Sequence, residues 1–452
     1  MKKHPLLPSR RLVLTGLGGA ATAVLAPRTA ALGQNPASAG RPSLDLRLRP
    51  STAGLRDNQP PSAIWDFVSA SGALPTAQEF RQGDDLQLAL ANDLPAPVTL
   101  SLRGLVGVAQ IEPLAARPPL LTGQSSSISV PLRLAGTLLC DARLLGDGQA
   151  LALPARAIRV MEKQPVAVDA DQTLLIEDWR LKPDGSAVAP GSDPGGASPL
   201  FTVNSKPSLD IPVWTNARLR LRFINACQRS VIALKIDDHE LRVMAIDSQP
   251  AEPFVARNGQ VILAPGTRVD AFVDTTGKPS TTAAVQLHDG TSPRPIARLV
   301  YVSEGPLRAA PLAAPDPLPS NGLPAKLDLK SALRVDLPVD IKPTPSAPEW
   351  LLPTNLGASV APAFRIKRGR VAVLALANRA ATPAVVHLHG HPFRLLDRLD
   401  DGWKPFWLDT LILEAGQTQR IAFAAEYSGS WLIEAMGTDW SAPRLTRWYV
   451  VD

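Results

Sequence analysis

The chain carries the heptapeptide HLHGHPF at residues 387–393, which contains three of its six histidines. Successive side chains of a β-strand point to opposite faces, so His387 and His389 share one face if this stretch is a strand. Two imidazoles on one strand face are a common nitrogen donor pair for a metal ion. The pattern therefore makes His387 and His389 the candidate ligands of a metal ion. His391 follows a glycine that can turn the chain, and it is the weaker candidate.

The segments after this heptapeptide follow in a particular order. WLDT stands at residues 407–410, EAG at 414–416 and GSW at 429–431. This order resembles the C-terminal cupredoxin domain of multicopper oxidases, in which an HLHGH stretch, a D-T pair and a G-x-W segment precede the sequence HCHxxxH. The resemblance implies a β-sandwich fold and places His387 and His389 at copper-ligand positions.

Most other ligand positions of that family hold residues that do not bind copper. Ala384 stands where the resemblance places a blue-copper histidine, and Ala435 stands where it places the cysteine thiolate. Four further histidine positions are also substituted, by Ser101, Arg103, Asp141 and Arg143.

The arginines at these positions predict ion pairs in place of copper. A guanidinium is permanently charged and has no lone pair for a metal. We expect Arg103 or Arg143 to pair with Asp141 or Glu434 and to fill the space that copper occupies in the family.

The number of histidines limits the chemistry. By the resemblance, a complete oxidase site takes about ten histidines and one cysteine, whereas this chain has six histidines in total. We predict no catalytic residues and no cofactor; the alternative cofactor is a residual copper ion at His387 and His389, with Glu434 or Met436 as a third ligand. The other interpretation is that these histidines serve packing and hydrogen bonding.

Composition indicates a folded, all-β chain of several domains. The 452 residues include 45 prolines, and 45% of the residues are hydrophobic. Frequent proline favours short strands and turns over helices. We predict three tandem cupredoxin-like Greek-key β-sandwich domains at residues 61–162, 163–304 and 346–452. A flexible lead-in at 34–60 precedes them, and a Pro/Ala-rich connecting strap at 305–345 joins the last two.

The three predicted domains share a weak internal repeat. Each contains an alternating strand that ends in asparagine, at Asn92, Asn225 and Asn378. A repeat of this length is typical of tandem β-sandwiches. The first strand is expected at residues 44–48 (LDLRL), which alternate with period two.

Two polar segments in the middle domain are expected to lie on the protein surface. RLRLRFINA at residues 218–226 alternates strictly and places three arginines on one strand face, which we interpret as solvated rather than as an anion site. His239 lies among the acidic residues 237, 238 and 240, and we interpret this segment as an exposed turn. The acidic pair at 400–401 is likewise interpreted as a surface turn.

The N-terminus has the three regions of an export signal. Lys2, Lys3 and the pair at 10–11 precede an apolar stretch at 12–26, which is too short to remain as a membrane-spanning helix. We predict a twin-arginine (Tat) signal peptide at 1–33, which implies localisation in the periplasm. No integral membrane span is expected after its removal.

The net charge argues against a nucleic-acid partner, and the two cysteines leave their pairing open. The formal net charge is +6, but five of the 47 basic residues lie in the predicted signal, which leaves 42 against 41 acidic residues. A nearly neutral chain lacks the basic surface that a nucleic-acid partner needs. Cys140 and Cys227 are compatible with a disulfide or with two buried thiols.

The combination of a Tat signal, three cupredoxin-like domains and lost copper ligands resembles the FtsP (SufI) family of cell-division proteins. The resemblance implies a non-enzymatic periplasmic scaffold that stabilises the division machinery under stress, with septal or divisome proteins as partners. One alternative is an oxidoreductase with a residual mononuclear copper site at the HLHGH motif. Another is a small-molecule binding protein that uses the vacated copper cavity between the first and third domains.

Overall fold

A computed structural model describes residues 41–69, 72–340, 350–357, 359–397, 402 and 404–452. The stretch from Arg41 to Asp452 packs as one unit. The predicted signal peptide, the first part of the lead-in and the acidic pair at 400–401 lie outside the described residues.

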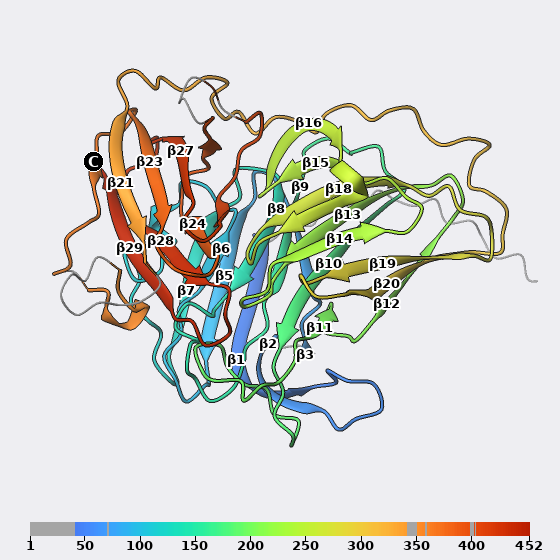
Figure 1. Cartoon of the computed structure of the whole chain (residues 1–452), viewed down its shortest axis with the longest axis horizontal. Helices are drawn as coiled ribbons and strands as arrows, with labels where there is room; N and C mark the ends of the chain where they lie inside the picture. The colour runs from blue at the N-terminus through green and yellow to red at the C-terminus, as the bar shows by residue number, and fades with distance from the viewer. Residues whose placement is uncertain (1–40, 70–71, 341–349, 358, 398–401, 403) are drawn as a thin grey trace, which may run out of the picture. The chain divides into compact units, whose positions relative to one another are not determined.

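The described strands form six sheets, two in each of three consecutive stretches that we call domains 1, 2 and 3 (Figure 1). Domain 1 contains β1 (Ser43–Ala53), β2 (Ser62–Ser69), β3 (Gly72–Ala73), β4 (Ala77–Arg81), β5 (Asp85–Asn92), β6 (Ser101–Arg103), the 3₁₀ turn η1 (Ala109–Ile111), β7 (Ser125–Pro131), β8 (Gly136–Asp141) and β9 (Arg156–Met161). Domain 2 contains β10 (Ala170–Trp179), β11 (Leu200–Val203), β12 (Leu209–Val213), β13 (Arg218–Asn225), β14 (Ile232–Ile236), β15 (Arg242–Ile246), β16 (Gln249–Val255), η2 (Arg257–Gly259), β17 (Gln260–Leu263), β18 (Arg268–Asp274), β19 (Thr282–His288) and β20 (Pro293–Tyr301). Domain 3 contains β21 (Leu333–Val339), η3 (Pro353–Asn355), β22 (Arg365–Ile366), β23 (Val371–Asn378), β24 (Ala384–Leu388), β25 (Arg394–Leu395), β26 (Thr410–Leu413), β27 (Thr418–Ala424), β28 (Gly429–Gly437) and β29 (Arg444–Val451).

The three domains repeat one topology, which confirms both the all-β prediction and the predicted repeat. In one sheet of each domain, β1, β10 or β21 runs parallel to a central strand, β5, β13 or β23 respectively. That central strand then pairs antiparallel with β7, β18 or β27. Each domain encloses its own hydrophobic core between its two sheets, as expected for β-sandwiches.

The repeated asparagine closes each central strand in the same way. Its side-chain amide donates to two or more backbone carbonyls, and its side-chain oxygen accepts the backbone N–H two residues further on. All three asparagines are at most 2% exposed. The side chain thus satisfies backbone groups that the end of the strand leaves buried and unpaired.

We expect Asn225→Ala to lower the free energy of unfolding by about 2–3 kcal/mol, because the substitution removes the amide partner of one buried carbonyl, one partly buried carbonyl and one buried N–H. Equilibrium urea unfolding measures the change. Asn355→Ala, at an exposed asparagine in η3, is the matched control and should unfold like the unmodified chain. A wild-type unfolding midpoint for Asn225→Ala would contradict this role.

Two predicted boundaries differ from the structure. The stretch predicted as a flexible lead-in, 34–60, contains β1, which pairs with β2 and β5 because its alternating leucines enter the core. This strand includes the predicted first strand at 44–48. The predicted strap, 305–345, contains β21, which pairs with β23, and its residues 341–345 lie outside the described residues. Its earlier part carries no strand, and Figure 1 shows it running from β20 to β21.

The arginine face of β13 is buried, so its interpretation as a solvated face is wrong. Arg220 and Arg222 are 1% and 0% exposed and share the carboxylate of Asp270. Arg220 also pairs with Glu162, which follows β9 of domain 1. The face alternates as predicted, but domain 1 covers it, and acidic residues neutralise the guanidinium groups there.

Both cysteines, Cys140 and Cys227, are free and buried. Of the two alternatives, a disulfide or two buried thiols, the structure therefore shows the second. His239 lies in a turn, where its ring nitrogens contact the carbonyl oxygen of Asp237 and the hydroxyl of Tyr301. Within the described part of the chain, no helix is long and apolar enough to cross a membrane.

Candidate functional site

The predicted histidine strand lies beside β28 and faces out of domain 3. β24 and β28 pair antiparallel, with His387 opposite Glu434. On both strands the alternate residues, among them Ala384 and Ala435, fill the hydrophobic core of the domain. The period of two therefore turns His387 and Glu434 to the other face, where domain 1 packs.

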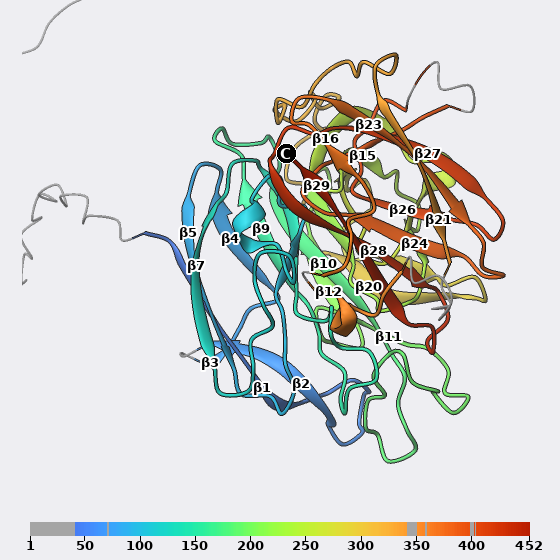
Figure 2. The same ribbon diagram turned by 90° about the vertical axis from the view of Figure 1, so that its left-hand side faces the viewer.

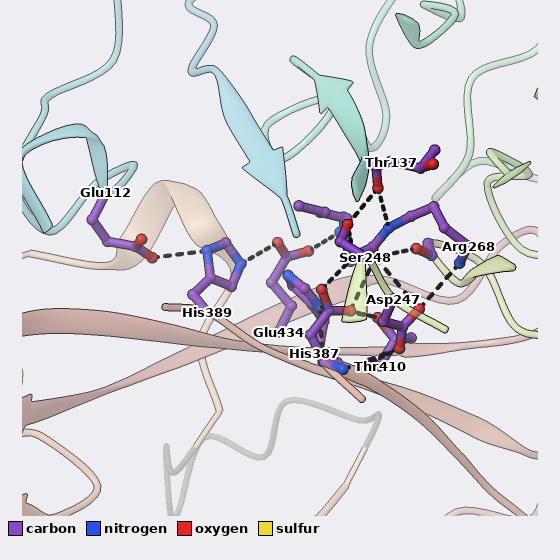
Figure 3. Close-up of polar contacts among 12 residues, drawn as sticks. Glu112, Thr137, Asp247, Ser248, Arg268, His387, His389, Thr410 and Glu434 are labelled. Atoms are coloured by element: carbon purple, nitrogen blue, oxygen red, sulfur yellow. Dashed lines mark hydrogen bonds and ion pairs between the residues drawn. The ribbon is translucent and has the colours of Figure 1, made fainter. Parts of the chain in front are cut away.

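His389 is held between two carboxylates (Figure 3). Its Nδ1 lies 2.8 Å from Oε1 of Glu112, in the loop after η1, and its Nε2 lies 2.8 Å from Oε1 of Glu434. Burial disfavours a charge on the ring, but the two carboxylates outweigh it and raise the pKa of His389 to about 9. The ring is therefore an imidazolium at neutral pH, and both N–H groups donate.

The second carboxylate oxygen of Glu434 accepts hydrogen bonds from two arginines. Oε2 lies 2.8 Å from Arg103 and 2.7 Å from Arg444, and all three side chains are almost fully buried. Although burial opposes its charge, Arg103 and Arg444 hold the pKa of Glu434 well below its usual value. The predicted pairing of Arg103 with Glu434 is confirmed.

The other predicted ion pair is also present. Arg143 lies 3.0 Å from the carboxylate of Asp141, which in addition accepts the backbone N–H of Arg143. Arg143 also donates to the backbone carbonyl of Ala226 in domain 2. Arg143 and Asp141 thus bind to each other, and Arg143 also links domain 1 to domain 2.

His387 is neutral and points toward the same space. Its Nδ1–H donates to the backbone carbonyl of Asp409 and to the hydroxyl of Thr410, at 3.0 Å each. Burial, and then the positive charge of Arg103, lower the pKa of His387 to about 4. The ring centroids of His387 and His389 are 4.6 Å apart. The structure therefore brings these two predicted residues together.

His391 points away from them, into the core of domain 3. Its Nε2 accepts the backbone N–H of Tyr427, and its Nδ1–H donates to the hydroxyl of Tyr449. Tyr449 in turn donates to the backbone carbonyl of His389. Burial lowers the pKa of His391 to about 3. His391 thus supports the position of His389 through Tyr449.

The donor set around His387 and His389 does not fit copper. A metal needs the lone pair of a neutral imidazole, and both nitrogens of His389 carry protons that face carboxylates. Of the two rings, only that of His387 therefore has a lone pair available for a metal, at Nε2. Among the described residues, no group of three His, Cys, Asp or Glu side chains is arranged to hold a metal ion. Copper binding here stays a prediction, and the geometry counts against it.

The space between domains 1 and 3 is small. The chamber lined by Ser101, Glu112, His387 and His389 has a volume of about 30 Å³, which is about the share of one water molecule. The hypothesis of a small-molecule site in this space stays a prediction, and the geometry counts against it, because ion-paired side chains leave little room.

A second charged group, which the sequence analysis missed, joins all three domains. Arg268 of domain 2 donates to both carboxylate oxygens of Asp409 in domain 3, at 3.0 and 2.6 Å, and to the backbone carbonyl of Thr137 in domain 1. The carboxylate of Asp247 accepts the backbone N–H groups of Asp409 and Thr410. Figure 3 shows this group beside His387. Strand alternation alone gave no sign of it.

Glu112 is the other missed residue, and no local pattern singles it out.

We expect the interaction of His389 with Glu112 and Glu434 to make the stability of the fold depend on pH. A histidine whose pKa is raised from ~6.5 on folding stabilises the fold fully below pH ~6.5 and loses that contribution as the pH rises through about 9. Thermal unfolding between pH 6 and 10 should show this loss in the unmodified chain. The uncharged variant His389→Gln should lack it, and equal pH profiles for the two proteins would contradict the assignment.

Comparison with known proteins agrees with this architecture. Two models of the multicopper oxidase family match the chain, over residues 163–297 and 334–450. No curated protein matches the sequence.

Solved structures share the fold over most of the chain. A multi-copper oxidase from Pseudomonas thermotolerans aligns with a TM-score of 0.75 and 22% identity, covering 91% of this chain and 99% of its own. Lac15 from a marine microbial metagenome aligns with a TM-score of 0.73 and 21% identity, over 90% and 100%. McoA from Aquifex aeolicus aligns with a TM-score of 0.70 and 14% identity, over 90% and 96%. The two family matches together span more than half of the chain, which therefore belongs to the multicopper oxidase family and is built from its cupredoxin-like domains.

Proposed function

We propose that this protein is a copper-free, non-enzymatic member of the family that acts as a periplasmic scaffold. One observation carries the proposal: both ring nitrogens of His389, at a copper-ligand position, lie 2.8 Å from carboxylate oxygens, those of Glu112 and Glu434, which favours the protonated ring. A protonated imidazole repels a cation and offers it no lone pair.

The neighbouring positions support the same conclusion. Arg103, Arg143 and Arg444 bring three permanent positive charges into the space where copper ions would lie, and each contacts a carboxylate. Ala384 and Ala435 stand at the blue-copper positions and belong to the hydrophobic core. The framework of the family is thus retained, while buried ion pairs replace its electron-transfer groups.

The cellular role is proposed from the resemblance to the FtsP (SufI) proteins. That family combines a twin-arginine leader with cupredoxin-like domains that have lost their copper ligands, and the sequence analysis predicts the same combination for this chain. We propose that the chain is exported to the periplasm by the Tat pathway and stabilises the division machinery under stress through septal protein partners.

The second candidate function is an oxidoreductase with a single copper ion at His387 and His389. It is favoured by the Nε2 lone pair of His387, which the hydrogen bonds of Nδ1 leave available. Solved structures with the same fold are described as multi-copper oxidases.

Copper loading separates the two functions. The full chain, incubated with excess Cu²⁺ and desalted, should retain far less than one copper ion per chain and should not consume dioxygen with a phenol. The double variant His387→Ala/His389→Ala should retain the same background. Stoichiometric copper that this double variant loses, together with phenol oxidation, would establish the oxidoreductase instead.

The cell-division role needs its own test. A deletion strain should form filaments or lyse under salt or envelope stress, and the intact gene should restore division. A tagged chain should capture septal proteins from stressed cells, whereas a chain without residues 1–33 should neither reach the periplasm nor restore division. Normal division of the deletion strain under these stresses would reject the role.

A further inference from the structure

Domain 1 contains a cavity that is separate from the chamber at His389. It has a volume of about 210 Å³ and opens between its two sheets. Its apolar wall includes Leu88, Leu90, Val98 and Ile128, and the first three are buried core residues. An apolar cavity of ~150 Å³ already accepts benzene, so this cavity is large enough for an organic ligand.

The rim of the cavity is polar and positively charged. Arg117 and Ser126 both line it, and the guanidinium of Arg117 donates to the hydroxyl of Ser126. Arg117 is half-buried and contacts no carboxylate within the described part of the chain. Buried arginines elsewhere in this protein, such as Arg103, pair with carboxylates. The guanidinium of Arg117 therefore keeps its capacity to bind an anion beside an apolar space.

A second polar group faces the same space. Thr99 also lines the cavity; among the described residues its hydroxyl has no hydrogen-bond partner, and it is not one of the buried unpaired groups, so water in the cavity can reach it. A hydroxyl that contacts only water can exchange that water for a polar ligand group. A ligand with a polar head would therefore find a hydroxyl as well as a charged group in this cavity.

Access to the cavity is at the edge of a sheet. Ile128 and Ser126 belong to β7, which stands at the end of its sheet beside β5. Figure 2 shows these two strands side by side. The segment between β6 and β7, which carries Arg117, lies opposite, so a ligand can enter without separation of paired strands.

We propose that this cavity binds a small amphipathic carboxylate, a medium-chain fatty acid of about six to eight carbons. The alkyl chain would lie against Leu88, Leu90 and Val98. The carboxylate would accept charge-assisted hydrogen bonds from Arg117, which suits the planar fork of a guanidinium. This site uses no residue of the ion-paired cluster and is independent of the proposed scaffold function.

Calorimetric titration of the full chain with octanoate, and separately with octanol, tests the proposal. We expect saturable binding of one octanoate per chain and at least about tenfold weaker binding of octanol, because the alcohol forms no ion pair. Arg117→Gln should lower the affinity for octanoate by about tenfold and leave the affinity for octanol unchanged. Arg117→Lys should restore part of the preference, since it restores the charge.

Two further variants distinguish the cavity from other surfaces. Ile128→Trp, on the edge strand, should fill the cavity and abolish binding of both ligands while the melting temperature stays near that of the unmodified chain. Arg49→Gln, at an exposed arginine of β1, should bind octanoate normally. The proposal is overturned if octanoate does not saturate, if octanol binds equally well, or if Arg117→Gln leaves octanoate affinity unchanged.

Discussion

Replacing Glu434 with glutamine is expected to lower the free energy of unfolding by about 3–5 kcal/mol. Glu434 is the carboxylate that Arg103, Arg444 and His389 share, and all four side chains are at most 6% exposed. Glutamine keeps the shape but removes the negative charge, so three buried cations lose their common counterion. Breaking one side of a buried ion pair costs more than the pair contributes, because the remaining charge stays desolvated.

Urea and thermal unfolding measure this change. The matched control is Glu414→Gln, which removes the same charge from an exposed glutamate in domain 3 and should change little. A second measurement follows the histidine: without Glu434, the pKa of His389 should fall from about 9, because one of its two carboxylates is gone. If Glu434→Gln unfolds like Glu414→Gln, the cluster does not hold the domains together as described.

Much of this cluster could be predicted from the sequence, because its residues stand at positions with a known geometry. Alternation placed His387 and His389 on one strand face, and the arginine at position 103 required a nearby carboxylate, for which Glu434 was a candidate. The repeated asparagines likewise predicted three similar sandwiches, because each strand end leaves the same backbone groups to satisfy. Each of these inferences needs only the alternation within one strand or the pairing of two strands, which the sequence pattern carries.

The missed residues depend on contacts between domains. Glu112 lies in a loop without periodicity, and it meets His389 only because domain 1 packs on domain 3. The arginines of β13 alternate like a solvated face, and their burial follows from the position of domain 1, which single-strand patterns do not encode. Arg268 lies 141 residues from Asp409 in the chain. Pairings over such distances follow from the assembled fold.

Arg268→Met is expected to destabilise the protein by about 3–5 kcal/mol at neutral pH, with a distinctive dependence on pH. Burial opposes a charge on Asp409, but Arg268, and then His387, hold its pKa far below the usual value. Burial, and then the charge of Asp409, raise the pKa of the adjacent Asp247 to about 7. Without Arg268, two buried carboxylates face each other with no guanidinium between them, and one of them should take up a proton.

The sign of the pH effect follows from these shifts. In the unmodified chain, the lowered pKa of Asp409 gives stability above pH ~4 that is lost as the pH falls. In Arg268→Met the folded pKa of Asp409 should lie above its unfolded value, so this group should favour folding below pH ~4 and lose that contribution as the pH rises. The difference in stability between the two proteins should therefore shrink steadily from pH 8 to pH 5.

Arg298→Met is the matched control for this prediction. Arg298 also contacts both oxygens of an aspartate, Asp210, but both side chains are about half exposed. Water and salt screen such a pair, so its loss should have little effect at any pH in this range. Thermal unfolding of the three proteins from pH 5 to 8 makes the comparison. A constant deficit for Arg268→Met across this range would mean that its guanidinium contributes packing and backbone hydrogen bonds rather than neutralisation of Asp409 and Asp247.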